Sequence, residues 1–417
     1  MKNNEILNVL SDKTKKEIIL YLNESVENFL NIFENSNFDD LNIESYFYFL
    51  VNLLDSENFK DIEEKIKENI IKILEYKKTL IYQGTSENLR GIIDGVLLFS
   101  YSLYKLEDIA NMKIKNFLKY FQIQSEREIT YFLEEVKKRS LVFSYYDLIS
   151  GCSGFLRYLL NVQSKNLILI DSISEYLISL ADEKKYRGKN IINFHIEGKN
   201  QFQKIEKITQ PNGHVNFGLA HGIISSIIVL SEVFKKNGNK KIKHVIDKLI
   251  KLYEKVENNN DVLSYPMQLS YEDYVSETYK GKDICSWCYG NIGIVRGLMI
   301  VYKNIQDKLK YNKYKEELIK IISRPIDDYK LECPYICHGY AGVIAIQLVS
   351  YKETKDKRFL NKLNQNIEAI FKLEKENFIG KEDYQEDIGL IEGQGGVILT
   401  LLGVFTEKML FKDMLLI

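Results

Sequence analysis

The stretch "WCYGNIGIVRGLMI" at residues 287–300 joins a paired-glycine turn to an apolar run of helical length. The same combination recurs as "GCSGFLRYLL" at 151–160, "GYAGVIAIQLV" at 339–349 and "GQGGVILTLL" at 393–402. Two weaker copies, "HGIISSIIVL" (221–230) and "IDGVLLFSYSL" (93–103), each keep one of the two glycines. Self-similarity of this kind predicts an architecture built from repeated supersecondary units.

The spacing of the copies predicts helical hairpins. Aligned on the second glycine position, they fall at 95, 154, 225, 293, 342 and 396, at intervals of about 50 to 70 residues. Each interval holds two helices of ordinary length and their connections. Six hairpins, none of which buries its apolar face alone, predict an all-α fold in which they stack side by side and close into a ring. An open solenoid is the competing geometry.

The remaining sequence is mainly helical, with one exception. Only four prolines occur in the 417 residues, and stretches such as "IEEKIKENIIKILEYKKTLI" at 62–81 have helical periodicity. At about 184–216, β-favouring residues lie among Gly, Asn and Pro turn signals, which indicates an insertion with some strand. We therefore expect one domain over residues 1–417 that contains this insertion.

Charge and hydropathy exclude several classes of protein. Lys and Arg number 57 against 58 Asp and Glu, so the net charge of -1 argues against nucleic-acid binding. The first residues lack the pattern of a signal peptide, and the longest apolar run, at 396–405, is about half of a bilayer crossing. We expect a cytoplasmic protein without a membrane span, in which the five cysteines are metal ligands or buried thiols rather than disulfides.

Polar residues directly before the glycine turns are the candidate functional residues, because loops at one end of a rigid scaffold commonly carry function. If the repeats share one geometry, these side chains meet at one end of the ring. They are Asp147, His221, Cys288, Tyr289, Cys337 and His338.

Cys288, Cys337 and His338 are the predicted ligands of one zinc ion, because two thiolates and an imidazole suit Zn²⁺ in tetrahedral geometry. Cys337 and His338 are adjacent, so both reach one ion only if they lie at a turn into a helix. Three protein ligands leave a fourth position open, which is typical of a catalytic zinc. A thiol in that position loses its proton, so the arrangement favours activation of a thiol nucleophile.

A structural four-cysteine zinc site is the alternative, since Cys285 and Cys288 form one short pair and Cys333 and Cys337 another. The repeat register favours the three-ligand site. Cys288 and Cys337 occupy equivalent places in two copies, whereas Cys285 and Cys333 do not, and His338 has no role in the four-cysteine site.

The other candidates supply acid/base chemistry. His221 lies in the equivalent position of its own copy, where a proton donor or acceptor would face an activated thiol. Asp147 either orients that histidine or caps a helix. Tyr289 is placed to donate a hydrogen bond to a developing oxyanion. His195, His214 and His244 are interpreted as structural, and so is Cys152.

The motifs "YDLISGCSG", "GLAHG", "WCYGNIG", "CHGYAG" and "IEGQGG", in this order, resemble the lanthionine synthetase C family. The resemblance implies an α/α toroid with an inserted smaller domain and one zinc ion held by residues matching Cys288, Cys337 and His338. It implies a cyclase that adds peptide cysteine thiols to dehydroalanine or dehydrobutyrine, which makes (methyl)lanthionine thioether rings. His221 is then the acid/base residue, Asp147 its partner and Tyr289 a neighbouring donor.

The implied partners are a dehydrated lanthipeptide precursor with its leader, the dehydratase that prepares it, and an exporter at the membrane. One departure from the family is that members commonly carry an arginine shortly before "WCYG", where this chain has Lys280 and Lys282. A lysine lacks the planar fork of arginine, so the group that stabilises the enolate stays open. A prenyltransferase-like thiol alkylation and a non-catalytic zinc-dependent peptide-binding scaffold are the rival functions.

Overall fold

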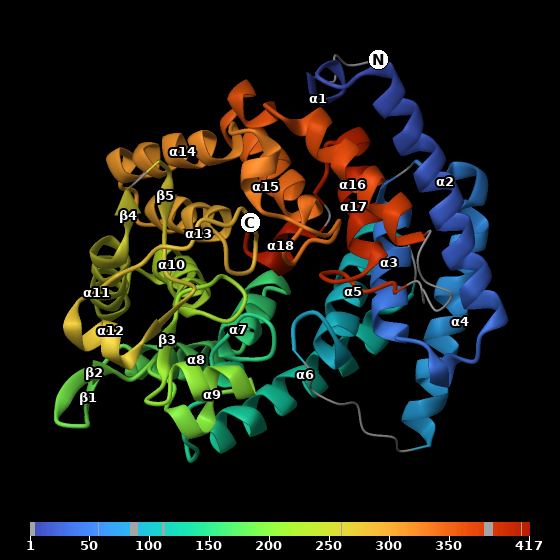
Figure 1. Ribbon diagram of the computed structural model, residues 1–417. Coiled ribbons are helices and arrows are strands. Elements are labelled where there is room, and N and C mark those ends of the chain that lie inside the picture. The colour runs from blue at the N-terminus through green and yellow to red at the C-terminus, as the bar shows by residue number, and fades with distance from the viewer. Residues whose placement is uncertain are drawn as a thin grey trace. The chain divides into compact units, whose positions relative to one another are not determined.

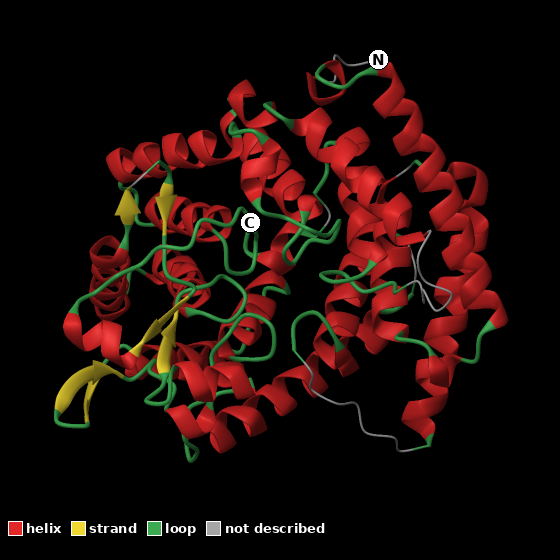
Figure 2. Cartoon of the chain, viewed as in Figure 1, coloured by secondary structure: helices red, strands yellow, loops and turns green. Residues whose placement is uncertain are grey.

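Helices dominate the computed structural model of the chain, and its strands are few and short (Figure 2). The structure describes residues 5–56, 58–83, 91–110, 113–259, 261–378, 387–409 and 411–417. These residues divide into two compact units. Unit 1 comprises Met1–Ser125 and Leu331–Lys412, and unit 2 comprises Glu126–Lys330 and Asp413–Ile417. The single domain expected over residues 1–417 stays a prediction.

Unit 1 is helical throughout its described residues (Figure 1). Its helices are α1 (Glu5–Asn8), α2 (Asp12–Asn35), α3 (Ile43–Ser56), α4 (Glu63–Tyr82), α5 (Gly95–Ile109), the first half of α6 (Lys115–Val136), α15 (Tyr340–Thr354), α16 (Leu363–Phe378) and α17 (Gln394–Thr406), with single 3-10 turns at Phe38–Asp40, Lys60–Ile62 and Lys357–Leu360. The helix predicted over 62–81 is confirmed as α4.

Unit 2 contains both helices and strands. Its helices are the rest of α6, α7 (Cys152–Asn161), α8 (Leu167–Leu180), α9 (Lys204–Thr209), α10 (Ile223–Asn237), α11 (Lys240–Val256), α12 (Tyr271–Ser276), α13 (Asn291–Asn304), α14 (Lys308–Ile322) and most of α18 (Lys412–Leu415), with 3-10 turns at Phe143–Tyr145, Gly198–Asn200 and Ile326–Tyr329. Its strands are β1 (Glu183–Tyr186), β2 (Lys189–Ile192), β3 (His214–Asn216), β4 (Asn258–Asn259), β5 (Leu263–Ser264) and β6 (Gln268–Ser270).

Six helices begin at or directly after a glycine turn of the repeat series, and we call them the glycine-turn helices: α5, α7, α10, α13, α15 and α17. In unit 2, α7 packs against α10 and α10 against α13. Each of them also packs against the helix that follows it, α8, α11 or α14. These contacts are those of the predicted hairpin repeat.

One equivalent helix lacks the glycine turn. In unit 1, α3 packs against both α17 and α5, although its sequence "IESYFYFLVNLLDS" contains no glycine. Every residue from Ser45 to Leu53 is buried, so α3 has the all-round burial of the glycine-turn helices. The six copies were identified by their glycine turn. Because α3 does not begin at such a turn, it was not among them.

The glycine-turn helices and the helices that follow them differ in how their apolar residues are distributed. In α15 every residue from Tyr340 to Tyr351 is buried, which the near-continuous apolar sequence predicts. By contrast, α11 buries a single stripe that includes Ile242, Ile246, Leu249 and Tyr253, while lysines cover its other face. Glycine-turn helices are thus enclosed on all sides, and their partners shield one flank from water.

The predicted strand-bearing insertion is confirmed in its secondary structure. Strands β1 and β2 form an antiparallel hairpin in the register Glu183↔Ile192, closed at Arg187 and Gly188. Strand β3 pairs outside the predicted stretch, with β6, in the register His214↔Ser270. The strand-bearing region therefore extends beyond residues 184–216, because the partner of β3 lies about 50 residues further along the chain, at Gln268–Ser270.

Candidate functional site

The candidate residues of unit 2 lie on three loops that are hydrogen-bonded to one another. Leu148 N donates to Ala220 O (3.1 Å), which ties the Asp147 loop to the His221 loop. Leu219 N and Ala220 N both donate to Cys288 O, at 2.6 and 3.2 Å. The repeats of this unit therefore share one geometry at their turns, and the structure brings Asp147, His221, Cys288 and Tyr289 to the same end of their helices.

Close backbone packing at these turns explains the glycines. A Cβ atom on Gly290 would lie 2.2 Å from Ser286 N, and one on Gly339 would lie 2.2 Å from Cys333 O. Distances this short do not occur between real atoms, so a side chain at either position displaces the turn. Cys288 and Cys337 are each two residues before such a glycine, and their placement depends on it.

His221 and Asp147 form a pair in which the carboxylate is buried and the imidazole is half-buried. The Nδ1 atom of His221 lies 2.6 Å from Asp147 Oδ2, and the side chain of Asp147 is fully buried while that of His221 is 29% exposed. Burial raises the pKa of Asp147, and the hydrogen bonds from His221 and from the Ser150 amide oppose that rise. With Nδ1–H donating to the carboxylate, Nε2 of His221 is left for proton transfer.

Of the two sequence interpretations of Asp147, the structure shows the contact with His221 but not a helix cap, because the N-cap of α7 is Gly151 and has no side-chain hydrogen bond. The Oδ1 atom of Asp147 accepts a hydrogen bond from Ser150 N at 2.8 Å, in the turn before α7, while Oδ2 faces His221. The local hydrogen bond fixes the carboxylate, and the fixed carboxylate orients the imidazole. Asp147 is therefore a turn residue and a histidine partner together.

Tyr289 lies next to this pair. Its ring centroid is 6.0 Å from that of His221, and the ring of Phe143 packs edge-on against the same imidazole at 4.8 Å. The Nδ2 atom of Asn216 donates to the Tyr289 hydroxyl at 3.1 Å. Burial raises the pKa of the Tyr289 phenol, so the hydroxyl is protonated at neutral pH and is able to donate.

Sequence reasoning missed Asn216. It lies five residues before His221, at the end of β3, and is 1% exposed. The only available signal was its closeness to the "GLAHG" motif, since a single buried asparagine has no spacing that points to function.

In unit 1, Cys337 and His338 lie on the turn into α15. Cys337 N donates to Ile391 O at 2.8 Å, which repeats between α15 and α17 the loop-to-loop bond seen in unit 2. Although the two residues are adjacent, the Cys337 Sγ atom and a ring nitrogen of His338 lie within 4.8 Å of each other. The adjacent Cys337 and His338 lie at a turn into a helix, as the sequence predicted, and both donor atoms are therefore within reach of one ion.

The remaining cysteines differ from these. Cys285 is fully buried, and burial raises the pKa of its thiol to about 12. Burial likewise raises the pKa of Cys152, which fits its interpretation as a small buried residue. Cys333 is half-buried, and within the described part of unit 1 it does not join Cys337 and His338 in a group able to hold a metal. Within the described part of unit 1, the donor that lies beside Cys337 is His338, as the three-ligand interpretation expects, and not Cys333.

The lysines that stand near the family's arginine position are exposed. Lys282 donates its backbone N to Tyr265 O, and Lys280 and Lys282 both have exposed side chains. A nearby arginine is already engaged, because the Arg324 guanidinium makes two bonds to Asp283, at 2.7 and 3.0 Å. Among the described residues, none of these three cations forms a hydrogen bond or ion pair with His221.

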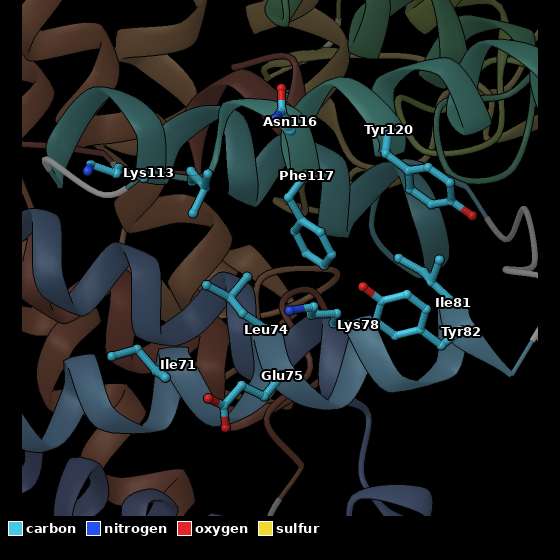
Figure 3. Close-up of a pocket in the computed structure, with 11 residues that line it drawn as sticks. Ile71, Leu74, Glu75, Lys78, Ile81, Tyr82, Lys113, Asn116, Phe117 and Tyr120 are labelled. Carbon is cyan, nitrogen blue, oxygen red and sulfur yellow. The ribbon is translucent and has the colours of Figure 1, made fainter.

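A separate cavity of about 560 Å³ lies in unit 1 between α4 and α6 (Figure 3). Apolar and aromatic side chains such as Leu74, Tyr82, Phe117 and Tyr120 line it, together with the charged Lys78. It contains none of the candidate catalytic or metal-binding residues. The chemistry of the candidate site therefore belongs to the glycine turns and not to this cavity.

These features define an all-α protein built from glycine-turn helices whose loops carry thiol, imidazole and carboxyl groups. The family model described as "Lanthionine synthetase C-like protein" matches residues 114–416. The chain belongs to this lanthionine synthetase C-like family, which confirms the resemblance drawn from its motifs.

The known proteins similar to it include a nisin biosynthesis protein and a nisin cyclase. The Nisin biosynthesis protein NisC of Lactococcus lactis subsp. lactis is 25% identical over 277 residues, which are 63% of this chain and 62% of that protein. The chain thus spans about three fifths of the length of this relative. The solved structure of a nisin cyclase matches with a TM-score of 0.75 at 22% identity, covering 97% of this chain and 99% of the other. This likeness confirms the predicted fold class, an α/α toroid.

Among the described residues, none of the helices combines the length and the apolar character that a membrane crossing requires.

Proposed function

We propose that this chain is a zinc-dependent lanthipeptide cyclase, which adds cysteine thiols of a dehydrated, leader-bearing precursor to dehydroalanine or dehydrobutyrine. Membership in the family supports the activity and the class of substrate. The observation that carries the proposal is the His221–Asp147 pair beside Tyr289, on loops bonded to the backbone of Cys288. A dehydratase that supplies the precursor and an exporter that takes the product are the partners that follow.

Zinc suits the donor atoms available. Cys288, Cys337 and His338 offer two thiolates and one imidazole, and the two donors on the α15 turn lie within reach of one ion. We assign these three residues as its ligands. Bound zinc supplies one piece of chemistry, which is to lower the pKa of the substrate's cysteine thiol so that it attacks as a thiolate.

The protein's own residues manage the proton and the developing charge. The new S–C bond forms at the β-carbon of the dehydroamino acid, and the π electrons move toward the α-carbon and its carbonyl oxygen. Nε2 of His221 takes up the thiol proton and returns it to the α-carbon, so that S–H has added across the double bond. Asp147 stabilises the charged imidazole in between. Tyr289 donates a hydrogen bond to the enolate oxygen.

The proposal is tested by incubating the protein with dehydrated, leader-bearing precursor peptides that are encoded next to the gene for this protein. We expect free thiols, counted by alkylation and mass spectrometry, to disappear with the wild-type protein. His221→Ala should slow this loss at least about a hundredfold, because general acid/base catalysis contributes that much. Cys337→Ala should abolish it. Thiols that all stay alkylatable with the wild-type protein would contradict the proposed activity, and unchanged cyclisation by His221→Ala would contradict the mechanism.

A further inference from the structure

The side-chain amide of Asn216 has only one orientation that satisfies its neighbours. Its Oδ1 atom lies 3.0 Å from Gly218 N, and a backbone N–H is a donor only, so the amide oxygen must be on that side. The amide nitrogen then faces the hydroxyl of Tyr289 at 3.1 Å. Because an amide nitrogen only donates, the Tyr289 oxygen accepts this hydrogen bond.

This bond fixes the direction of the tyrosine proton. An oxygen that accepts from Asn216 directs its own O–H elsewhere, and the proton is available for another acceptor. The ring is fixed as well, since Gly218 leaves room for it: a Cβ atom there would lie 2.5 Å from Tyr289 Cδ1 and 2.7 Å from Cys288 O. Packing thus holds the ring beside His221, and Asn216 sets the rotation of the hydroxyl.

We infer that Asn216 is a positioning residue that makes Tyr289 a hydrogen-bond donor to the enolate oxygen of the reacting peptide, and this inference rests on the proposed function. Tyr289 is the donor that lies beside His221, whereas Lys280 and Lys282 have exposed side chains and form no hydrogen bond with His221 among the described residues. As negative charge grows on the substrate oxygen, the bond from Asn216 polarises the tyrosine hydroxyl and strengthens its donation. The tyrosine touches the substrate and Asn216 does not.

A double-mutant cycle of Asn216→Ala and Tyr289→Phe tests this coupling on the dehydrated, leader-bearing peptides. Each single variant should lower kcat about tenfold and leave KM unchanged, because the lost hydrogen bond acts on the transition state. The double variant should be no slower than Tyr289→Phe alone, since without the hydroxyl Asn216 has nothing to orient.

Asn216→Asp is the matched variant. Its carboxylate still accepts from Gly218 N but presents an oxygen to Tyr289, so the tyrosine proton turns back toward residue 216. We expect kcat to fall about tenfold with Tyr289 present and to stay unchanged in the Tyr289→Phe background. This variant also serves if Asn216→Ala disturbs the loop, which thermal unfolding of each variant detects.

Two results would overturn the inference in distinguishable ways. If the losses multiply, so that the double variants are about a hundredfold slower than wild type, Asn216 acts independently of Tyr289 and only the inference fails. If the wild-type protein forms no thioether with any of the peptides, the proposed function fails, and the inference fails with it.

Discussion

At the scale of single residues, Asp147 decides which nitrogen of His221 carries the proton. Its Oδ1 atom is held by Ser150 N, so the other oxygen is the one that faces the imidazole. An asparagine in its place would keep its carbonyl oxygen on Ser150 N and turn its NH₂ group toward His221 Nδ1. The histidine would then be forced into the tautomer with the proton on Nε2, which is unable to act as a base.

Asp147→Asn should therefore lower the cyclisation rate at least about a hundredfold while the protein keeps its fold and its zinc. The rate comes from alkylation of remaining thiols, the metal content from elemental analysis, and the fold from thermal unfolding. Asp171→Asn, on the helix α8 of the same unit and outside the candidate site, is the control and should cyclise like wild type. A rate within twofold of wild type in Asp147→Asn would contradict the role given to the pair.

The sequence was sufficient for some of these residues and not for others. The proximity of His221 and Asp147 was predictable because each stands on the loop that leads into a glycine turn, and these loops are hydrogen-bonded to one another. The role of Asn216 was not predictable, because it depends on the rotation of its amide between Gly218 and Tyr289. Only the folded loop brings those two partners to one side chain.

At the scale of elements, the turns before five of the six glycine-turn helices, α7, α10, α13, α15 and α17, are packed too tightly for a side chain at their glycine. Gly290→Ala should lower the free energy of unfolding by about 1–3 kcal/mol, since its Cβ meets Ser286 N at 2.2 Å and must push the turn apart. Gly238, which ends α10 with a positive φ of 66°, has open space around its Cβ position. Gly238→Ala should cost only about 1 kcal/mol, from backbone strain alone. Urea unfolding of both variants measures the difference, and equal losses would contradict the packing argument.

The strand-bearing region contains a buried histidine that makes it sensitive to acid. His195 Nε2 lies 3.0 Å from Asn212 O, and Nδ1 has no hydrogen-bond partner among the described residues. Burial, with a smaller contribution from Lys184, lowers the pKa of His195 to about 4. The folded protein therefore keeps this histidine neutral at a pH where the unfolded chain, with a pKa near 6.5, is protonated.

His195→Gln should reduce the acid sensitivity of unit 2. The unfolded state binds more protons between about pH 6.5 and pH 4, so stability from this group is complete above 6.5 and is lost as the pH falls toward 4. Glutamine keeps an NH₂ donor for Asn212 O but does not titrate. Thermal midpoints measured from pH 7.5 to 4.5 should fall less steeply for the variant than for wild type. Parallel curves would show that His195 does not carry this sensitivity.

Helix α3 shows what the element pattern could and could not predict. The glycine turns identified six helices correctly, because each turn requires a residue without a side chain at one position. Helix α3 lies beside α5 and α17 with the same all-round burial, yet it is entered without that turn. Its apolar composition predicts a buried helix, while its membership in the repeat appears only from its packing partners.

At the scale of the whole molecule, the proposed zinc ligands come from both units of the chain. Cys288 belongs to unit 2, whereas Cys337 and His338 belong to unit 1. An ion that takes ligands from both makes the folding of each unit depend on the other, because neither unit alone supplies the full set. Under the proposed function, zinc would therefore be a folding ligand as well as the activator of the substrate thiol.

Removal of zinc by a chelator should therefore lower the thermal midpoint of the whole chain and broaden its unfolding into separable transitions. A ligand that binds only the folded state stabilises it by about 4 kcal/mol when its free concentration is a thousand times Kd. Returning zinc should restore a single, higher transition. Cys337→Ala should not respond to zinc, whereas Cys333→Ala should respond like wild type, because Cys333 lies outside the proposed ligand set. Loss of the response in Cys333→Ala, or in Cys285→Ala, would instead assign the metal to the four-cysteine site and remove the open position that thiol activation requires.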